Sequence, residues 1–255
     1  MELPRNDFKA ALHGEAIQYG CWAGLANGYA SEILATSGFD WMLLDGEHGP
    51  NTVPTLLAQL QAVAPYATAP VVRAVDGNPT LIKQLLDIGA QTLMIPMVES
   101  AEQARALVSA MRYPPQGIRG VGGGLVRATR WGSVPDYLAR AHEELCLIVQ
   151  IESGAGVDNV EEIAAVEGVD ALFVGPMDLS TDMGEAGNPG HPAVQERIRH
   201  VIEATHRAGK PCGILAPDEA DARRYAEWGC RFIAVGLDIV MLQAAAAETL
   251  RRYRD

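Results

Sequence analysis

The strongest constraint on the fold is a repeated alternation of short apolar segments with longer segments of helical periodicity. Strands are predicted at 19–23, 41–45, 70–75, 92–98, 145–152, 171–175, 211–216 and 232–236. Helices are predicted at 28–36, 52–64, 79–88, 101–111, 157–166, 192–208, 218–228 and 238–253. Eight βα units favour a closed (β/α)8 TIM barrel. The alternative, an open doubly wound sheet, is disfavoured because no G-x-G-x-x-G follows the first strand.

Length and composition are those of one globular domain covering residues 1–255. Hydrophobic residues make up 48% of the chain and no linker interrupts it. The net charge of −12 argues against nucleic acid or an anionic membrane as a partner. No signal-like or membrane-spanning apolar run is present, and the four cysteines form no C-x-x-C pair. We therefore expect a cytoplasmic protein that binds neither nucleic acid nor membranes.

Polar residues cluster at the predicted carboxyl ends of several strands. Catalytic groups of a TIM barrel come from these ends, so the following residues are expected to converge on one mouth. They are Asp45, Glu47, His48, Arg73, Glu99, Gln150, Glu152 and Asp178.

Among these residues, Glu152 and Asp178 follow neighbouring strands and offer two hard oxygen ligands. Such a pair suits Mg²⁺ or Mn²⁺, with Co²⁺ as a further option, although a strand-end carboxylate can also simply cap the next helix. His48 titrates near neutral pH and is placed to act as a general base. Arg73 lies in an apolar strand and needs an anionic partner, which could be a structural carboxylate or a substrate.

The three lysines bear on the mechanism. Lys9 precedes the first strand, Lys83 lies within a helix, and Lys210 precedes the seventh strand at the wrong end of the barrel. A Schiff-base lysine must project into the mouth. A Schiff-base mechanism is therefore disfavoured.

Six segments together resemble the HpcH/HpaI aldolases, and the resemblance covers essentially the whole chain. The segments are WMLLDGEHGPN, PVVRAV, LIKQLLDIGAQTLMIPMVE, YPPQGIRGVGGG, VQIES and LFVGPMDLS. The resemblance implies a barrel of the phosphoenolpyruvate/pyruvate type. It also implies a class II aldolase that makes or cleaves a 4-hydroxy-2-oxo acid, such as an aromatic-catabolism diacid or a sugar acid, through a pyruvate enolate and an aldehyde.

The resemblance also implies roles for individual residues. Glu152 and Asp178 would hold a divalent cation, His48 would be the base, and Arg73 would stabilise the developing oxyanion. Asp87 would raise the basicity of His48. The substrate would contact Gln150, Gly175, Pro176, Met177, Leu215 and Trp22, and Asp45 and Glu47 would orient metal-bound water.

The resemblance also bears on the assembly of the protein, and two other functions remain open. The resemblance implies a hexamer, a trimer of dimers, with the last helix exchanged. A citrate or citramalyl-CoA type lyase remains an alternative, because Arg119, Arg127 and Arg130 are expected near the mouth and could bind CoA phosphates. A non-catalytic barrel that binds a 2-oxo acid is a third possibility, against which the intact set of catalytic residue types argues.

Overall fold

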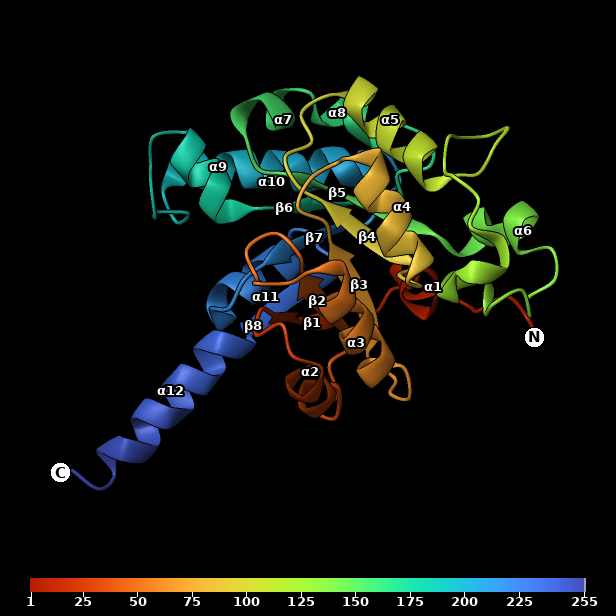
Figure 1. Ribbon diagram of the computed structural model, residues 1–255. Coiled ribbons are helices and arrows are strands. Elements are labelled where there is room, and N and C mark those ends of the chain that lie inside the picture. Colours follow the sequence, from red (N-terminus) through yellow and green to blue (C-terminus); the bar gives the residue numbers. More distant parts are fainter. Residues whose placement is uncertain (255) are drawn as a thin grey trace.

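The computed structural model describes residues 1–254 and is a closed barrel of parallel strands in sequence order (Figure 1). The first strand pairs with both the second and the last, which closes the barrel. The predicted (β/α)8 architecture is confirmed. The strands are β1 (Gln18–Ala23), β2 (Trp41–Asp45), β3 (Ala69–Arg73), β4 (Thr92–Ile95), β5 (Cys146–Ile151), β6 (Ala171–Val174), β7 (Cys212–Leu215) and β8 (Phe232–Leu237).

Helices surround the barrel, and several begin at side-chain caps. Asn27, Asn78 and Asp218 each accept hydrogen bonds from backbone amides of the first helical turn. The helices are α1 (Asp7–Leu12), α2 (Gly28–Ala35), α3 (Val53–Val63), α4 (Pro79–Asp87), α5 (Ala101–Met111), α6 (Tyr137–Glu144), α7 (Gly154–Asp158), α8 (Val160–Ala164), α9 (Pro176–Asp182), α10 (Pro192–Arg207), α11 (Glu219–Glu227) and α12 (Asp238–Arg251), with 3₁₀ turns η1 (Gly123–Leu125) and η2 (Arg127–Thr129).

Three helical segments differ from the predictions. The helix predicted at 157–166 is two short helices, α7 and α8, because Asn159 leaves the helical conformation at φ −99° and ψ 8°. Helix α1 was not predicted. It is only six residues long and is held by the burial of Phe8 and Leu12 under the barrel. Helix α9 was also not predicted as a helix, since its seven residues carry little periodicity.

Aromatic side chains fill the amino-terminal half of the barrel interior. Trp41, Phe173 and Phe232 contact one another with ring centroids 5.7–6.4 Å apart, and Phe8 packs on two of them. The Trp41 ring occupies the space where a side chain on Gly20 would lie. This apolar packing fills the barrel interior at one end, so a pocket inside the barrel can form only at the carboxyl ends of the strands.

Helix α12 leaves the barrel and projects away from it (Figure 1, blue). Asp238 at its first position is its one buried residue within the described part of the chain. Ile239, Val240 and Leu242 are each at least half exposed. None of the helices within residues 1–254 combines the length and apolar character needed to cross a lipid bilayer.

Candidate active site

A cavity of about 420 Å³ opens at the carboxyl ends of the strands. Its lining includes Asp45 and most of the other predicted site residues, but not Asp87, Glu47 or Glu99. Glu99 instead accepts a hydrogen bond from Ser153 Oγ at 2.7 Å. The other predicted residues that line the cavity are Trp22, His48, Arg73, Gln150, Glu152, Gly175, Pro176, Met177, Asp178 and Leu215. The expected convergence on one mouth is therefore observed for these residues.

The buried guanidinium of Arg73 is held by two carboxylates from the end of β2 and the loop that follows it. Asp45 faces Arg73 in the register of β2 and β3 and accepts hydrogen bonds from its Nε at 2.9 Å and its Nη2 at 2.7 Å. Glu47 Oε2 lies 2.7 Å from Nη1, as a charge contact and not as a directed hydrogen bond. The Trp22 ring lies against the guanidinium, with its centroid 5.0 Å from Cζ. Arg73 thus has the structural ion pair considered above and also faces the pocket.

Asp45 organises the turn that carries the histidine. Its Oδ1 accepts from the backbone amides of Glu47 at 3.0 Å and His48 at 3.3 Å, and its Oδ2 accepts from Trp22 Nε1 at 3.1 Å. Burial alone would raise the pKa of Asp45, but the hydrogen bonds and charge of Arg73 outweigh it and lower the pKa. Asp45 and Glu47 therefore bind Arg73 in this structure, and His48 stands exposed at the rim.

Glu152 is the most perturbed acid of the site. It is 3% exposed, and its Oε1 accepts from the backbone amide of Met97 at 2.8 Å. Burial, together with the nearby negative charges of Asp178 and Glu47, raises its pKa to about 7. A side chain on Gly175 would collide with this carboxylate, so glycine is required where β6 ends.

Asp178 lies in the first turn of α9, which begins at Pro176. No side chain caps this turn, so the capping role considered for Asp178 is not observed. Asp178 instead lines the cavity, together with Arg73 from β3 and with Gln150 and Glu152 from the end of β5.

The pair Glu152 and Asp178 fits a hard divalent cation. Within residues 1–254 no cluster of three or more His, Cys, Asp or Glu side chains could hold a metal, so water or substrate oxygens must supply the other ligands. Burial and the neighbouring acids Asp178 and Glu47 raise the pKa of Glu152, so its charged form is unfavourable here. A cation between Glu152 and Asp178 would stabilise that charged form.

Asp87 lies away from the pocket. It ends α4, at the end of the barrel where β4 begins, and its Oδ1 accepts from Arg119 Nη2 at 2.7 Å. His48 follows β2 at the opposite end. The predicted contact between Asp87 and His48 is therefore absent within the described residues of one subunit, because α4 carries Asp87 down the outside of the barrel.

The arginines expected near the mouth are also elsewhere. Arg119 is buried against Tyr113, with its Cζ 4.5 Å from the ring centroid. Arg127 and Arg130 line a separate cavity near the start of β4, at the amino-terminal end of the barrel. Arg127 and Arg130 lie there because the chain after α5 returns along the outside of the barrel. The mouth therefore lacks the basic surface that would have supported a CoA thioester substrate.

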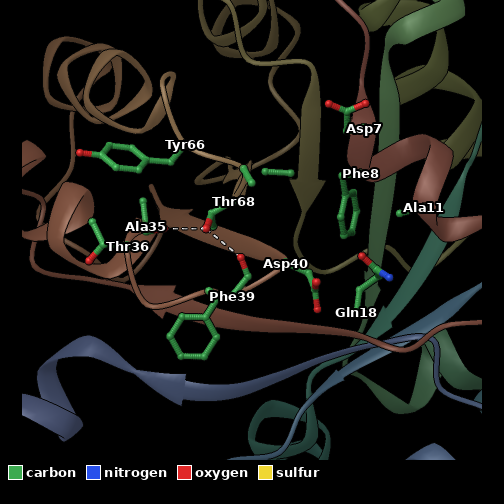
Figure 2. Close-up of a pocket in the computed structure, with 13 residues that line it drawn as sticks. Asp7, Phe8, Ala11, Gln18, Ala35, Thr36, Phe39, Asp40, Tyr66 and Thr68 are labelled. Carbon is green, nitrogen blue, oxygen red and sulfur yellow. Dashed lines mark hydrogen bonds between the residues drawn. The ribbon is translucent and has the colours of Figure 1, made fainter.

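A further cavity, of about 450 Å³, lies at the amino-terminal end of β1, β2 and β3 (Figure 2). Thr68 forms part of its wall and donates hydrogen bonds to the carbonyls of Ala35 and Phe39. The described residues that line it include the acids Asp7 and Asp40 but no cation. An anionic 2-oxo acid therefore suits the carboxyl-end pocket and not this cavity.

Sequence reasoning missed the side of the pocket formed by β8 and α12. Leu237, Asp238 and Ile239 line it, and Asp238 accepts from the backbone amides of Gly24 at 2.9 Å and Leu25 at 3.0 Å. Their position directly after the last strand was the available signal, since that is where a barrel places its site residues.

Comparison with known proteins agrees with this geometry. Residues 18–245 match the family model described as HpcH/HpaI aldolase/citrate lyase. A protein of Chromohalobacter salexigens named hydroxypyruvate/pyruvate aldolase is 70% identical over 254 residues, covering all of both chains. A Shigella sonnei protein named 4-hydroxy-2-oxo-heptane-1,7-dioate aldolase is 53% identical, covering 97% of this chain and 95% of its own.

A solved structure gives the same result at the level of the fold. The crystal structure of an HpcH/HpaI aldolase/citrate lyase family protein from Burkholderia cenocepacia J2315 has a TM-score of 0.94 and 42% identity. The match covers 98% of this chain and all of that chain. The resemblance found in the sequence is confirmed: this chain belongs to the HpcH/HpaI aldolase/citrate lyase family and is a carbon–carbon lyase, a class II aldolase.

Proposed function

We propose that this chain is a single-domain aldolase that adds the enolate of pyruvate or hydroxypyruvate to an aldehyde, and cleaves the resulting 4-hydroxy-2-oxo acid. The two donors are those in the names of relatives that are 70% identical. The observation that carries the proposal is the convergence of Arg73, Glu152 and Asp178 in one pocket, with His48 at its rim. Formation of an enolate from a 2-oxo acid requires these groups.

Glu152 and Asp178 would hold the divalent cation on which class II aldolases depend. Bound there, Mg²⁺, Mn²⁺ or Co²⁺ would act as a Lewis acid that polarises the 2-oxo group and stabilises enolate charge. The rest of the chemistry belongs to the side chains of the protein.

His48 is proposed to take the proton from C3 of the 2-oxo acid, and in cleavage to take the proton of the 4-hydroxyl group. The exposed position of His48 lets its imidazole exchange protons with solvent between turnovers. Arg73 faces the pocket from β3, held in position by Asp45 and Glu47. Its guanidinium would stabilise negative charge as it develops on the keto oxygen.

The remaining predicted substrate contacts form a polar side and an apolar side of the pocket. The backbone amides of Met177 and Asp178, after Gly175 and Pro176, are proposed to bind the substrate carboxylate. Trp22 and Leu215 lie on the apolar side, where they would border the aldehyde. Met177 is about half exposed, so it can also limit the size of the aldehyde.

Asp87 can reach a histidine only in an assembly. It lies at the opposite end of the barrel from His48 of its own subunit, so we propose that Asp87 of a partner subunit hydrogen-bonds to His48 and raises its basicity. The exposed apolar residues of α12 support the exchange of this helix between subunits of a hexamer built as a trimer of dimers.

All four cysteines are free and buried, which supports a reducing cytoplasmic location.

The test is exchange of the C3 protons of pyruvate in deuterium oxide, followed by proton NMR. We expect exchange with Mg²⁺ or Mn²⁺, its loss with a chelator, and its loss in His48→Ala and Arg73→Ala. His142→Ala replaces an exposed histidine of α6 and serves as the matched control. Absence of exchange by the wild-type protein with every metal would refute the proposal and favour a non-catalytic 2-oxo acid binding protein.

A further inference from the structure

The side-chain amide of Gln150 has one favoured orientation. Gln150 lies near the carboxyl end of β5, and the residue is 2% exposed. Its Nε2 donates to Glu152 Oε2 at 3.2 Å. When Glu152 is ionised, as metal binding requires, the reversed amide would place a carbonyl oxygen against this carboxylate and leave the NH₂ group without that acceptor. The orientation with Nε2 toward Glu152 is therefore favoured.

This orientation leaves Oε1 of Gln150 buried and without a hydrogen-bond partner among the described residues. A buried acceptor with no donor is costly, and native sites that contain one usually receive the donor from a ligand or a water molecule. Two side-chain donors that line the same pocket are already engaged. Arg73 is held by Asp45 and Glu47, and Trp22 Nε1 also donates to Asp45.

The two proposed nucleophilic substrates, pyruvate and hydroxypyruvate, differ in whether they can donate a hydrogen bond to this oxygen. Pyruvate, as an anion, has oxygen acceptors and no O–H or N–H group. Hydroxypyruvate carries one additional group, a hydroxyl on C3, which can donate. Only the second ligand can satisfy the Gln150 oxygen directly.

We propose that Gln150 Oε1 accepts a hydrogen bond from the C3 hydroxyl of the donor, which makes Gln150 the residue that selects a 3-hydroxy-2-oxo acid over pyruvate. This inference rests on the proposed function, because it concerns the donor of the same reaction. Sites built to hydrogen-bond a hydroxyl discriminate against analogues that lack it, since the polar group of the protein is then left unpaired.

The experiment compares Gln150→Met with the wild-type protein in the presence of Mn²⁺. Inhibition of pyruvate C3-proton exchange gives binding constants for hydroxypyruvate and for 3-fluoropyruvate, which has a similar size and cannot donate a hydrogen bond. We expect the wild-type protein to prefer hydroxypyruvate by about tenfold, the value of one hydrogen bond, and Gln150→Met to lose this preference. Gln116→Met, the same change at an exposed glutamine outside the pocket, should retain it.

Each outcome separates this inference from the proposed function. No pyruvate exchange by the wild-type protein refutes the proposed function itself. Exchange with equal binding of the two analogues by the wild-type protein overturns the role of Gln150 alone, even where the variant does not fold. A preference that survives in Gln150→Met also overturns it, and a raised requirement for Mn²⁺ in that variant would assign the oxygen to the metal shell.

Discussion

Replacing Glu152 by glutamine should stabilise the metal-free protein at alkaline pH. The carboxyl is 3% exposed, and its pKa rises from 4.5 to about 7, first because of burial and then because of neighbouring acids. A difference of about 2.5 pH units corresponds to roughly 3.5 kcal/mol at ~1.4 kcal/mol per unit, of which roughly 3 kcal/mol is expressed by pH 8. Glutamine removes this cost of ionisation, and its oxygen can still accept from the backbone amide of Met97.

The sign of the effect fixes its pH dependence. Because the folded-state pKa is raised, the folded protein binds the Glu152 proton more tightly than the unfolded chain does. The favourable contribution of this proton is therefore present below pH 4.5 and is lost as the pH rises through about 7. Glu152→Gln should add up to roughly 3 kcal/mol to the free energy of unfolding at pH 8 and little at pH 4.5.

Urea unfolding of both proteins with a chelator, from pH 4.5 to 8, measures this difference. Glu162→Gln, an exposed change on α8, is the matched control and should have no such effect. With Mn²⁺ the order should reverse, because the wild-type protein gains the free energy of metal binding and the variant loses a ligand. A variant that is no more stable at pH 8, or equally stabilised at both ends of the range, would refute the reasoning.

Three further changes test other parts of the structure. Arg73→Met leaves two carboxylates near the guanidinium site without their cation and should lower the free energy of unfolding, measured in urea, by about 3–5 kcal/mol. Gly20→Ala places a methyl group in the ring of Trp41 and should cost about 1–3 kcal/mol or more, seen as a lower melting temperature. Leu242→Asp on exposed α12 should reduce the sedimentation coefficient by dissociating the proposed hexamer, and an unchanged coefficient would contradict the proposed helix exchange.

The barrel could be predicted from the sequence because its signals are local. Each strand is a short apolar run and most helices start at a cap such as Asn27 or Asp218, so order and type follow from the chain itself. Helix α1 and the break at Asn159 could not be found in this way. The first depends on packing of Phe8 against the barrel, and the second interrupts a pattern that otherwise looks continuous.

The polar half of the site was predicted for a related reason. Carboxyl ends of parallel strands must meet, so Arg73, Glu152 and Asp178 converge once the strands are correctly placed. Asp87 shows the limit of this reasoning. A motif indicates that the residue belongs with the site, but it does not say at which end of a subunit the residue lies or which subunit uses it.

The position of Gln150 joins the stability of the pocket to its chemistry. The Gln150 amide nitrogen donates to Glu152, the carboxylate whose pKa is raised to about 7, and the Gln150 amide oxygen is left without a hydrogen-bond donor among the described residues. Folding therefore leaves a charge and an acceptor only partly satisfied, and the proposed metal ion and substrate would supply what both lack. A cation would stabilise the ionised Glu152, and a hydroxyl on the substrate would satisfy Gln150. A site arranged in this way is more stable when occupied than when empty, because binding removes unfavourable interactions that the fold retains.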